Sequence, residues 1–326
     1  MVVVTGATGH LGNALVRELL ARGKEVRTVI RPFRDTTSIE GLEVERVEGD
    51  VRNVDSLIQA FKGADVVYHL AGMISILPGK AELLHQVNVR GTRNAVEACL
   101  KSGVPRLVYT SAIQAIAEPP GGTVIDETLP FDPDTAIGEY DKTKAQGTLQ
   151  ILEGVQKGLD AVIVCPTGVI GPYDFKPSEM GQMFIDFARG KLKAYIDGAY
   201  DFVDVRDVAV GHILACEKGR TGESYILSGE RITLDDLMLL LEEVTGASIP
   251  HLKMPIWLAR IMAIFTPLYY RVTNTIPRFT KYSIRTLTSN SVISREKSRR
   301  ELGYFPRPIR EIIEDTIRWF NEAGKL

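Results

Sequence analysis

Short apolar runs alternate with longer segments of helical periodicity through the first half of the chain. The runs are rich in β-branched residues, which is typical of strands buried on both faces of a sheet. The predicted strands are Val2–Thr5, Val26–Ile30, Glu43–Glu48, Asp65–Leu70, Arg106–Ser111 and Ala161–Cys165. The predicted helices between them are Leu11–Ala21, Val54–Lys62, Leu83–Lys101 and Tyr140–Lys157. Strands that alternate with helices predict a parallel sheet covered on both faces.

A glycine follows each predicted helix where a left-handed cap is expected. These glycines are Gly23, Gly63, Gly103 and Gly158. The alternation is lost after Pro166, where glycines and prolines predict a long connection. The segments 172–195, 231–290 and 296–326 are predicted to be helical or irregular, and Ser224–Leu227 has the pattern of a strand. We therefore expect an α/β region at 1–165 and a smaller, mostly helical region at 166–326, with the strand at 224–227 returning to the first sheet.

The most apolar later stretch runs from Met254 to Tyr270. Pro255, Arg260 and Pro267 interrupt it, so it is too short and broken to span a bilayer. We interpret it as a buried helix of the C-terminal region or of a dimer interface. A helix that lies on a membrane surface is the alternative.

Composition adds mainly exclusions. The chain is 44% hydrophobic and 25% charged with a formal net charge of -2, and acidic and basic residues are mixed along it, so no nucleic-acid surface is expected. The cysteines Cys99, Cys165 and Cys216 form no CxxC pair, which favours a reducing, cytoplasmic location. The first strand begins at Val2, so we expect no targeting signal. The histidines lack metal-ligand spacing, so no metal is expected.

Three glycines at three-residue spacing, Gly6, Gly9 and Gly12, join the first strand to the first helix. One glycine makes the tight turn, one lets backbone N–H groups approach a pyrophosphate, and one lets the helix pack closely on the strand. The anion then lies at the positive end of the helix. This arrangement predicts a Rossmann fold, a doubly wound parallel sheet that binds a dinucleotide. The candidate cofactor-binding residues of the loop are Gly6, Thr8, Gly9, His10, Leu11 and Gly12.

The residue after the second strand bears on which cofactor is bound. An NAD site usually places an acidic residue there for the ribose 2′-hydroxyl, whereas this chain has Arg31. A guanidinium pairs well with a 2′-phosphate, so NADP is favoured, with NAD as the alternative. Arg31 could instead be a solvated charge that stacks on adenine.

Tyr140 and Lys144 are one helical turn apart and share a face of a predicted helix. An ammonium beside a phenol favours the phenolate, so we expect the pKa of Tyr140 to fall below about 10. Tyr140 is then a candidate acid/base for proton transfer.

The chain resembles the extended short-chain dehydrogenase/reductase superfamily, and most of all bacterial members that are dihydroflavonol-4-reductase-like or NAD-dependent epimerase/dehydratase-like. The resemblance runs through nearly the whole chain in the family's order. The matching segments are Thr5–Gly12, Glu48–Asp50, His69–Gly72, Val87–Thr92, Val108–Ser111, Tyr140–Lys144, Pro166–Pro172, Phe202–Val208 and Leu302–Tyr304.

The resemblance implies roles for individual residues. Tyr140 would be the acid/base, and Lys144 would hold the ribose hydroxyls. Asn88 resembles a buried structural asparagine. Further cofactor contacts are implied beside the adenine, under the nicotinamide ribose and on the other side of the nicotinamide. The residues implied for these are Asp50 and Val51, then Leu70, Ala71 and Gly72, then Pro166, Gly168 and Val169. For Asp50 and Asn88, a helix-cap or turn role is an equal alternative.

One position departs from the family pattern. Family members usually carry a hydroxyl residue where this chain has Ala112, and that hydroxyl binds the substrate oxygen. On a regular strand Ser111 points to the opposite face, but a bulge would turn it toward the pocket. We therefore predict that Ser111 reaches the catalytic pocket through an irregular strand end.

The leading hypothesis is an NADP-dependent reductase of a carbonyl group, with a small-molecule, apolar substrate held by residues 166–326. A nucleotide-sugar epimerase or dehydratase is the second hypothesis, and a non-catalytic dinucleotide-binding protein is the third. The fold alone does not decide among them. The resemblance also suggests a homodimer through the helices Leu83–Lys101 and Tyr140–Lys157.

Overall fold

A parallel sheet forms the centre of the computed structural model, which describes residues 1–75, 79–273 and 281–326, with side chains described for all of these except 265–273. The strands are β1 (Val2–Thr5), β2 (Val26–Ile30), β3 (Glu45–Glu48), β4 (Val66–His69), β5 (Arg106–Thr110), β6 (Ala161–Pro166) and β10 (Ser224–Leu227). Their order is β10-β6-β5-β4-β1-β2-β3, and every neighbouring pair is parallel. This is the predicted doubly wound α/β fold, including the returning strand at 224–227.

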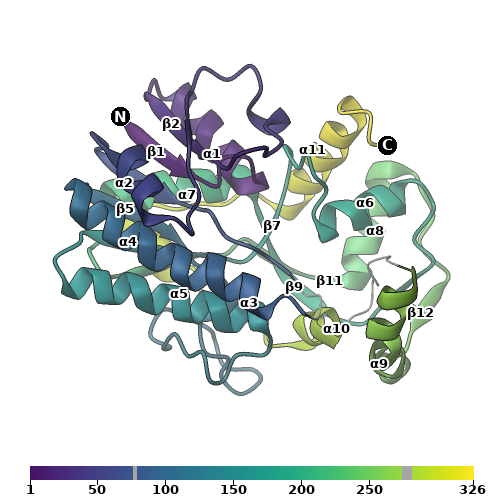
Figure 1. Cartoon of the computed structure of the whole chain (residues 1–326). Coiled ribbons are helices and arrows are strands. Elements are labelled where there is room, and N and C mark those ends of the chain that lie inside the picture. Colours follow the sequence, from purple (N-terminus) through teal and green to yellow (C-terminus); the bar gives the residue numbers. More distant parts are fainter. Residues whose placement is uncertain (76–78, 274–280) are drawn as a thin grey trace.

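Helices cover both faces of this sheet (Figure 1). One face carries α2 (Val54–Phe61), α4 (Gly91–Ser102) and α5 (Glu139–Gln156), and the other carries α1 (His10–Ala21) and α7 (Val205–Lys218). The predicted helix at 83–101 is interrupted: α3 (Ala81–Leu84) passes into the π-helical turn η2 (His85–Arg90) before α4. The glycines predicted to cap four helices all have positive φ angles. Because strand order reverses between β1 and β4, the carboxyl ends of these strands border the crevice where such folds bind dinucleotides.

The C-terminal region contains strands that the sequence did not predict. β7 (Gly168–Ile170), β9 (Ala199–Asp204) and β11 (Glu230–Thr233) form one small sheet, and β8 (Ala194–Ile196) pairs with β12 (Leu252–Met254). The region is mostly helical, as expected, and these short strands are what the prediction missed. These strands are short and lie between polar residues, so they leave little periodicity to detect. The helices of this region are α6 (Glu179–Ala188), α8 (Leu234–Thr245), α9 (Ile256–Thr273), α10 (Lys281–Thr288) and α11 (Ile309–Glu322).

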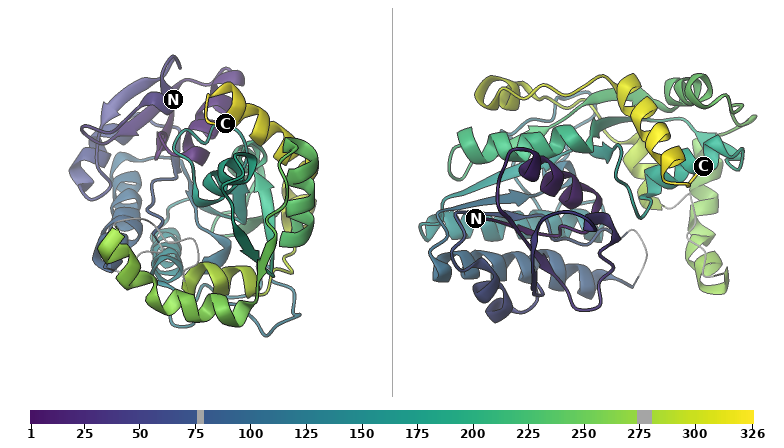
Figure 2. Two further views of the ribbon diagram at one scale, coloured as in Figure 1. Left: turned by 90° about the vertical axis from the view of Figure 1, so that its right-hand side faces the viewer. Right: turned by 90° about the horizontal axis from the view of Figure 1, so that it is seen from above.

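The remaining turns are short: η1 (Thr37–Ile39), η3 (Ile113–Ala115) and η4 (Ser298–Leu302). The small sheet and its helices share a core of their own. Within that region α9 lies at the outer edge, and Figure 2 shows it projecting from the body of the molecule. None of the described helices has the length and apolar character needed to cross a bilayer.

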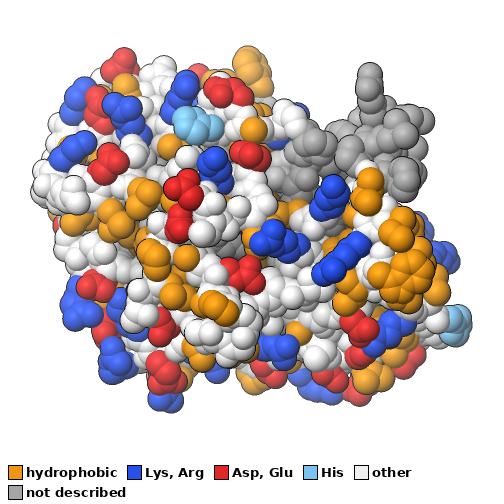
Figure 3. All heavy atoms as spheres, turned by 90° about the horizontal axis from the view of Figure 1, so that it is seen from below, with side chains coloured by type: hydrophobic (Ala, Val, Ile, Leu, Met, Phe, Trp, Pro, Cys, Tyr) orange, Lys and Arg blue, Asp and Glu red, His pale blue; other side chains and the backbone are white. Residues whose placement is uncertain are grey.

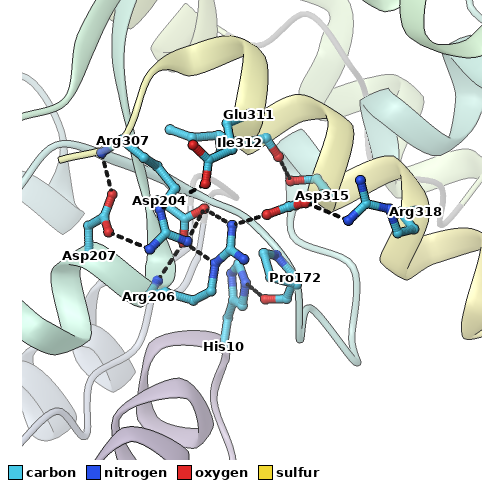
Figure 4. A network of polar contacts seen from close by, with 11 residues as sticks. His10, Pro172, Asp204, Arg206, Asp207, Arg307, Glu311, Ile312, Asp315 and Arg318 are labelled. Carbon is cyan, nitrogen blue, oxygen red and sulfur yellow. Dashed lines mark hydrogen bonds and ion pairs between the residues drawn. The ribbon is translucent and has the colours of Figure 1, made fainter.

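A buried ionic network ties α7 to α11 (Figure 4). Asp204 is fully buried at the end of β9; its carboxylate accepts the backbone N–H of Arg206 and two bonds from the Arg206 guanidinium at 2.9 and 2.7 Å. Arg206 also pairs with Asp315 of α11 at 2.7 Å, and Arg307 pairs with Asp207 at 2.9 Å. The Phe202–Val208 motif therefore fixes the position of the last helix against the sheet.

Candidate active site

The glycine loop has no room for side chains at two of its three glycines. Gly6 has a φ of +76°, and a Cβ there would lie 2.7 Å from the backbone nitrogen of Ala71. A Cβ on Gly12 would lie 2.1 Å from the carbonyl oxygen of Gly6. These contacts press the first turn of α1 against β1 and bring the loop to the end of β4, as the predicted Rossmann loop requires.

The N-terminal end of α1 is open to an anion. Gly9 is the N-cap and gives no side-chain hydrogen bond, and the first turn holds no acidic residue. Backbone N–H groups of the first turn therefore have no side-chain acceptor, which fits a pyrophosphate there. His10 is half-buried, and its Nε2 lies 2.9 Å from the carbonyl oxygen of Pro172 (Figure 4). It therefore joins the glycine loop to the segment after β7.

The adenosine side of the crevice lies at the ends of β2 and β3. Arg31 is exposed, and its charge helps to lower the pKa of Asp50, although the hydrogen bond from Arg52 is the main cause. Asp50 also accepts the backbone N–H of Arg52 at 2.9 Å, so it is a turn residue as well as a neighbour of the crevice. Val51 is buried against Gly91. These residues lie at the carboxyl ends of β2 and β3, and their contact with the adenosine half of a cofactor stays a prediction.

The segment after β4 is held rigidly. Thr5 Oγ1 accepts the backbone N–H of Ala71 and lies 2.8 Å from Nδ1 of His69. Asn88 is buried in the π turn; it accepts the N–H of Met73 at 2.8 Å and donates to the carbonyl oxygen of Met73 at 3.0 Å. It also donates to Thr143 Oγ1 of α5 at 3.1 Å. Asn88 thus fixes the predicted nicotinamide-ribose wall, Leu70 to Gly72, against the helix that carries Tyr140.

Tyr140 and Lys144 lie on the first turns of α5, as predicted. Lys144 is buried, and its ammonium donates to the carbonyl oxygen of Thr110 at 2.6 Å and to Tyr109 Oη at 3.2 Å. It also lies 4.7 Å from the centre of the Tyr109 ring. The sheet therefore holds the ammonium at the end of β5, beside the crevice.

The expected fall in the pKa of Tyr140 is wrong for this structure. Burial raises the pKa of Tyr140, and the neighbouring Asp141, Tyr109 and Tyr200 raise it further. Lys144 is not among the groups that act on this pKa, and its ammonium points to Thr110 and Tyr109. Tyr140 therefore keeps its proton at neutral pH, which suits a proton donor.

Ser111 does not turn toward Tyr140. The strand end is regular: the N–H of Ser111 bonds to the carbonyl oxygen of Val164, and Ala112 is extended with φ −157° and ψ 155°. Ser111 is buried with Oγ 2.6 Å from Thr148 Oγ1, which is two turns beyond Tyr140 on α5. The predicted irregular strand end is thus wrong, and the catalytic role of Ser111 stays a prediction that this geometry does not favour.

Three side chains that the sequence did not indicate, Gln114, Tyr200 and Tyr282, lie near Asp141 at the start of α5. Gln114, in η3, donates to Tyr200 Oη of β9, and Tyr282 Oη of α10 donates to Asp141 Oδ1 at 2.6 Å. Burial raises the pKa of Asp141 to about 6, although the Tyr282 bond opposes this. Gln114, Asp141 and Tyr200 border a cavity of about 60 Å³. Gln114, Tyr200 and Tyr282 come from η3, β9 and α10, which are far from Tyr140 in the chain, so spacing gave no signal for them.

The segment after β6 brings Tyr200 to the site. Gly168 lies under the Tyr200 ring, where a Cβ would come within 2.6 Å of a ring carbon. Pro166 is buried, whereas Gly168 and Val169 are partly exposed. The rest of the lining of the cavity beside Tyr200 mixes apolar and polar side chains, and Glu118 and Asp132 are among the polar ones. Its apolar lining includes Ile113, Ile116, Ile125, Ile137 and Ile293.

A glycine cradle at the end of β1, an uncapped helix, and Tyr140 and Lys144 one turn apart on α5 define a nicotinamide-dinucleotide-dependent enzyme of the extended short-chain dehydrogenase/reductase type. The comparison with protein families agrees with this class. Residues 2–228 match the NAD dependent epimerase/dehydratase family, and the chain belongs to it.

Similar proteins cover the full length of the chain. It is 40% identical over 99% of both chains to sterol demethylase protein B of Methylococcus capsulatus. It is 33% identical to a putative dihydroflavonol 4-reductase of Synechocystis, over 98% of this chain and 94% of the relative. The crystal structure of gox2253 superposes with a TM-score of 0.88 at 35% identity, over 100% of this chain and 99% of that chain. The predicted family and fold are therefore confirmed.

Proposed function

We propose that the protein reduces a ketone or aldehyde on an apolar substrate with NADPH. The observation that carries this proposal is the position of Tyr140 and Lys144 on the first turns of α5, with the Lys144 ammonium held at the end of β5 beside the crevice. An alkoxide is a stronger base than a phenolate, so a phenol of high pKa can still protonate the oxygen formed in reduction. When bound, the nicotinamide supplies the hydride. Tyr140 supplies the proton, and Lys144 lies one turn further where ribose hydroxyls would be bound.

Gln114 is our proposed second donor to the substrate oxygen. Ala112 has no donor, and Ser111 is engaged by Thr148. One N–H of the Gln114 amide is used by Tyr200, which leaves the other free for a carbonyl oxygen in the cavity. Such a donor stabilises the negative charge that develops on the oxygen.

The choice of NADPH rests on the end of β2. Arg31 is exposed there, and Asp35, the nearest acidic residue in the following turn, is occupied by Thr37 and Lys176. An apolar substrate is supported by the isoleucines around the cavity and by the sterol and dihydroflavonol named in the two relatives.

Loss of NADPH absorbance tests the proposal, with ketosteroids, dihydroflavonols, aldehydes and a sugar nucleotide as substrates. Tyr140→Phe should lower kcat by about 100-fold or more while NADPH still binds. Tyr195→Phe, at a half-buried tyrosine of β8 in the C-terminal region, is the matched control and should behave as the wild type. If Tyr140→Phe reduces the best substrate at the wild-type rate, the proposed role is wrong.

Sugar-nucleotide epimerisation or dehydration is the second candidate, and the family match favours it. These reactions return the hydride within one turnover, so they consume no added cofactor. Protein that is purified with bound dinucleotide and converts a sugar nucleotide without added NADPH would support this candidate over reduction.

A further inference from the structure

The first half of α9 presents its apolar side to solvent. Ala259 and Ala263 are the buried stripe, at 0% and 1% exposure. The opposite side carries large apolar residues, of which Trp257 and Ile264 are 63% and 57% exposed. The exposed apolar residues of this strip are Trp257, Leu258, Ile261, Met262 and Ile264. A helix of a globular protein normally turns polar residues outward, so this arrangement is the reverse of the usual one.

The charge around this strip is one-sided. From residue 244 to residue 295 the chain has no Asp or Glu and seven Lys or Arg residues. The segment's formal charge is +7, whereas the whole chain carries -2, which leaves -9 for the remainder. Lys253 is already paired with Asp197 and Asp235.

Three other basic residues of the segment are free to meet an external anion. Arg260, Lys281 and Arg285 are exposed, and none of them forms an ion pair within the described part of the chain. Arg260 lies on α9 itself, and the other two lie on α10, which packs beside α9. Figure 3 shows Lys and Arg side chains next to hydrophobic ones at the right of the molecule, where α9 lies.

We propose that the first half of α9, residues 256–264, docks on the surface of a membrane that contains anionic lipid. Large apolar side chains with a basic border are the pattern of helices that lie at the boundary between headgroups and acyl chains. Arg260, Lys281 and Arg285 would meet lipid phosphates. A strip on one helix is narrow for a stable dimer, which buries roughly 1,200–2,000 Å², and the projection of α9 seen in Figure 2 suits a broad, flat surface.

The docked surface lies close to the site. Tyr282 of α10 bonds to Asp141, the residue after Tyr140. A membrane under α9 would therefore lie beside the catalytic helix, and an apolar substrate could leave the lipid phase there. Docking itself does not depend on the proposed reaction.

Vesicle binding of the full chain tests the proposal without turnover. Sedimentation with vesicles of phosphatidylcholine alone is compared with phosphatidylcholine mixed with phosphatidylglycerol. Wild-type protein should bind the anionic vesicles more tightly. Arg260→Gln should weaken that binding roughly five-fold, and Trp257→Gln with Ile261→Gln by roughly ten-fold or more. Leu239→Gln, a 51% exposed residue of α8, is the control and should bind as the wild type.

Fluorescence gives a second measurement. The chain has two tryptophans, so Trp319→Phe leaves Trp257 as the reporter. Its emission should shift to shorter wavelength with anionic vesicles and be quenched by brominated lipid. NADPH affinity checks that each variant is folded. The proposal is overturned if the wild-type protein does not bind anionic vesicles, or if the Trp257/Ile261 variant binds them as tightly as the wild type. The proposal is also overturned if the wild-type protein binds no vesicles but forms a dimer that the Trp257/Ile261 variant does not form. The strip would then be an interface between two copies of the chain.

Discussion

Replacing Asp204 by asparagine should destabilise the protein strongly, because the substitution keeps the shape of the side chain and removes its charge. Asp204 is fully buried, and its two oxygens accept the Arg206 guanidinium at 2.9 and 2.7 Å. In Asp204→Asn one oxygen becomes an NH₂ group that faces an N–H donor. Removing one partner of a buried ion pair costs ~3–5 kcal/mol. Arg206 keeps Asp315 and is 26% exposed, so we expect a loss of about 2–4 kcal/mol.

Urea unfolding followed by tryptophan fluorescence measures this loss, since Trp319 lies on α11 close to Asp315. The matched control is Asp197→Asn, which removes the same charge from an exposed pair with Lys253 and should leave the midpoint nearly unchanged. The network would not be a major stabilising element if both variants shifted the midpoint equally.

Four further outcomes are expected at the candidate site. In steady-state assays Gln114→Leu should lower kcat by about 10²-fold, whereas Ser111→Ala should change kcat little. If Ser111→Ala instead lowers kcat strongly and Gln114→Leu does not, Ser111 is the donor to the substrate oxygen, as first predicted. Arg31→Ala should weaken NADPH roughly ten-fold more than NADH in titrations, and equal losses would refute the NADPH assignment. Burial raises the pKa of Asp141 from 3.8 to about 6, so the folded state binds the carboxyl proton more tightly than the unfolded chain does. Stability should therefore fall as the pH rises from about 4 to about 6. Asp141→Asn should abolish this fall, which thermal unfolding measured across pH would show. The same variant should lower the pKa of Tyr140 and move the alkaline limb of the pH–rate profile to lower pH, and an unmoved limb would show that Tyr140 does not set it.

The central sheet was predictable because its strands are continuous apolar runs bounded by glycine loops and amphipathic helices. β1, β2 and β10 begin and end where the sequence placed them. The small sheets were not predictable, since a strand such as β8 has only three residues and gains its stability from pairing.

The site was predictable only where its residues are close in sequence. The glycine loop and the Tyr140–Lys144 pair have fixed spacings, and both lie where expected. The contacts of Gln114 with Tyr200 and of Tyr282 with Asp141 depend on how distant segments fold together. The pKa of Tyr140 was mispredicted for the same reason, because burial and the neighbouring Asp141, Tyr109 and Tyr200 raise it.

The return of β10 to the edge of the central sheet has a consequence for synthesis of the chain. β6 is buried along its whole length, and β10 pairs with it in parallel after more than fifty intervening residues. A nascent chain that has emerged only as far as residue 165 would expose the outer edge of β6 and lack α7 on one face. The ribosome must therefore deliver β7, β9 and α7 before the first sheet can close, and a premature stop in that interval should yield an aggregation-prone fragment and not a stable dinucleotide-binding module.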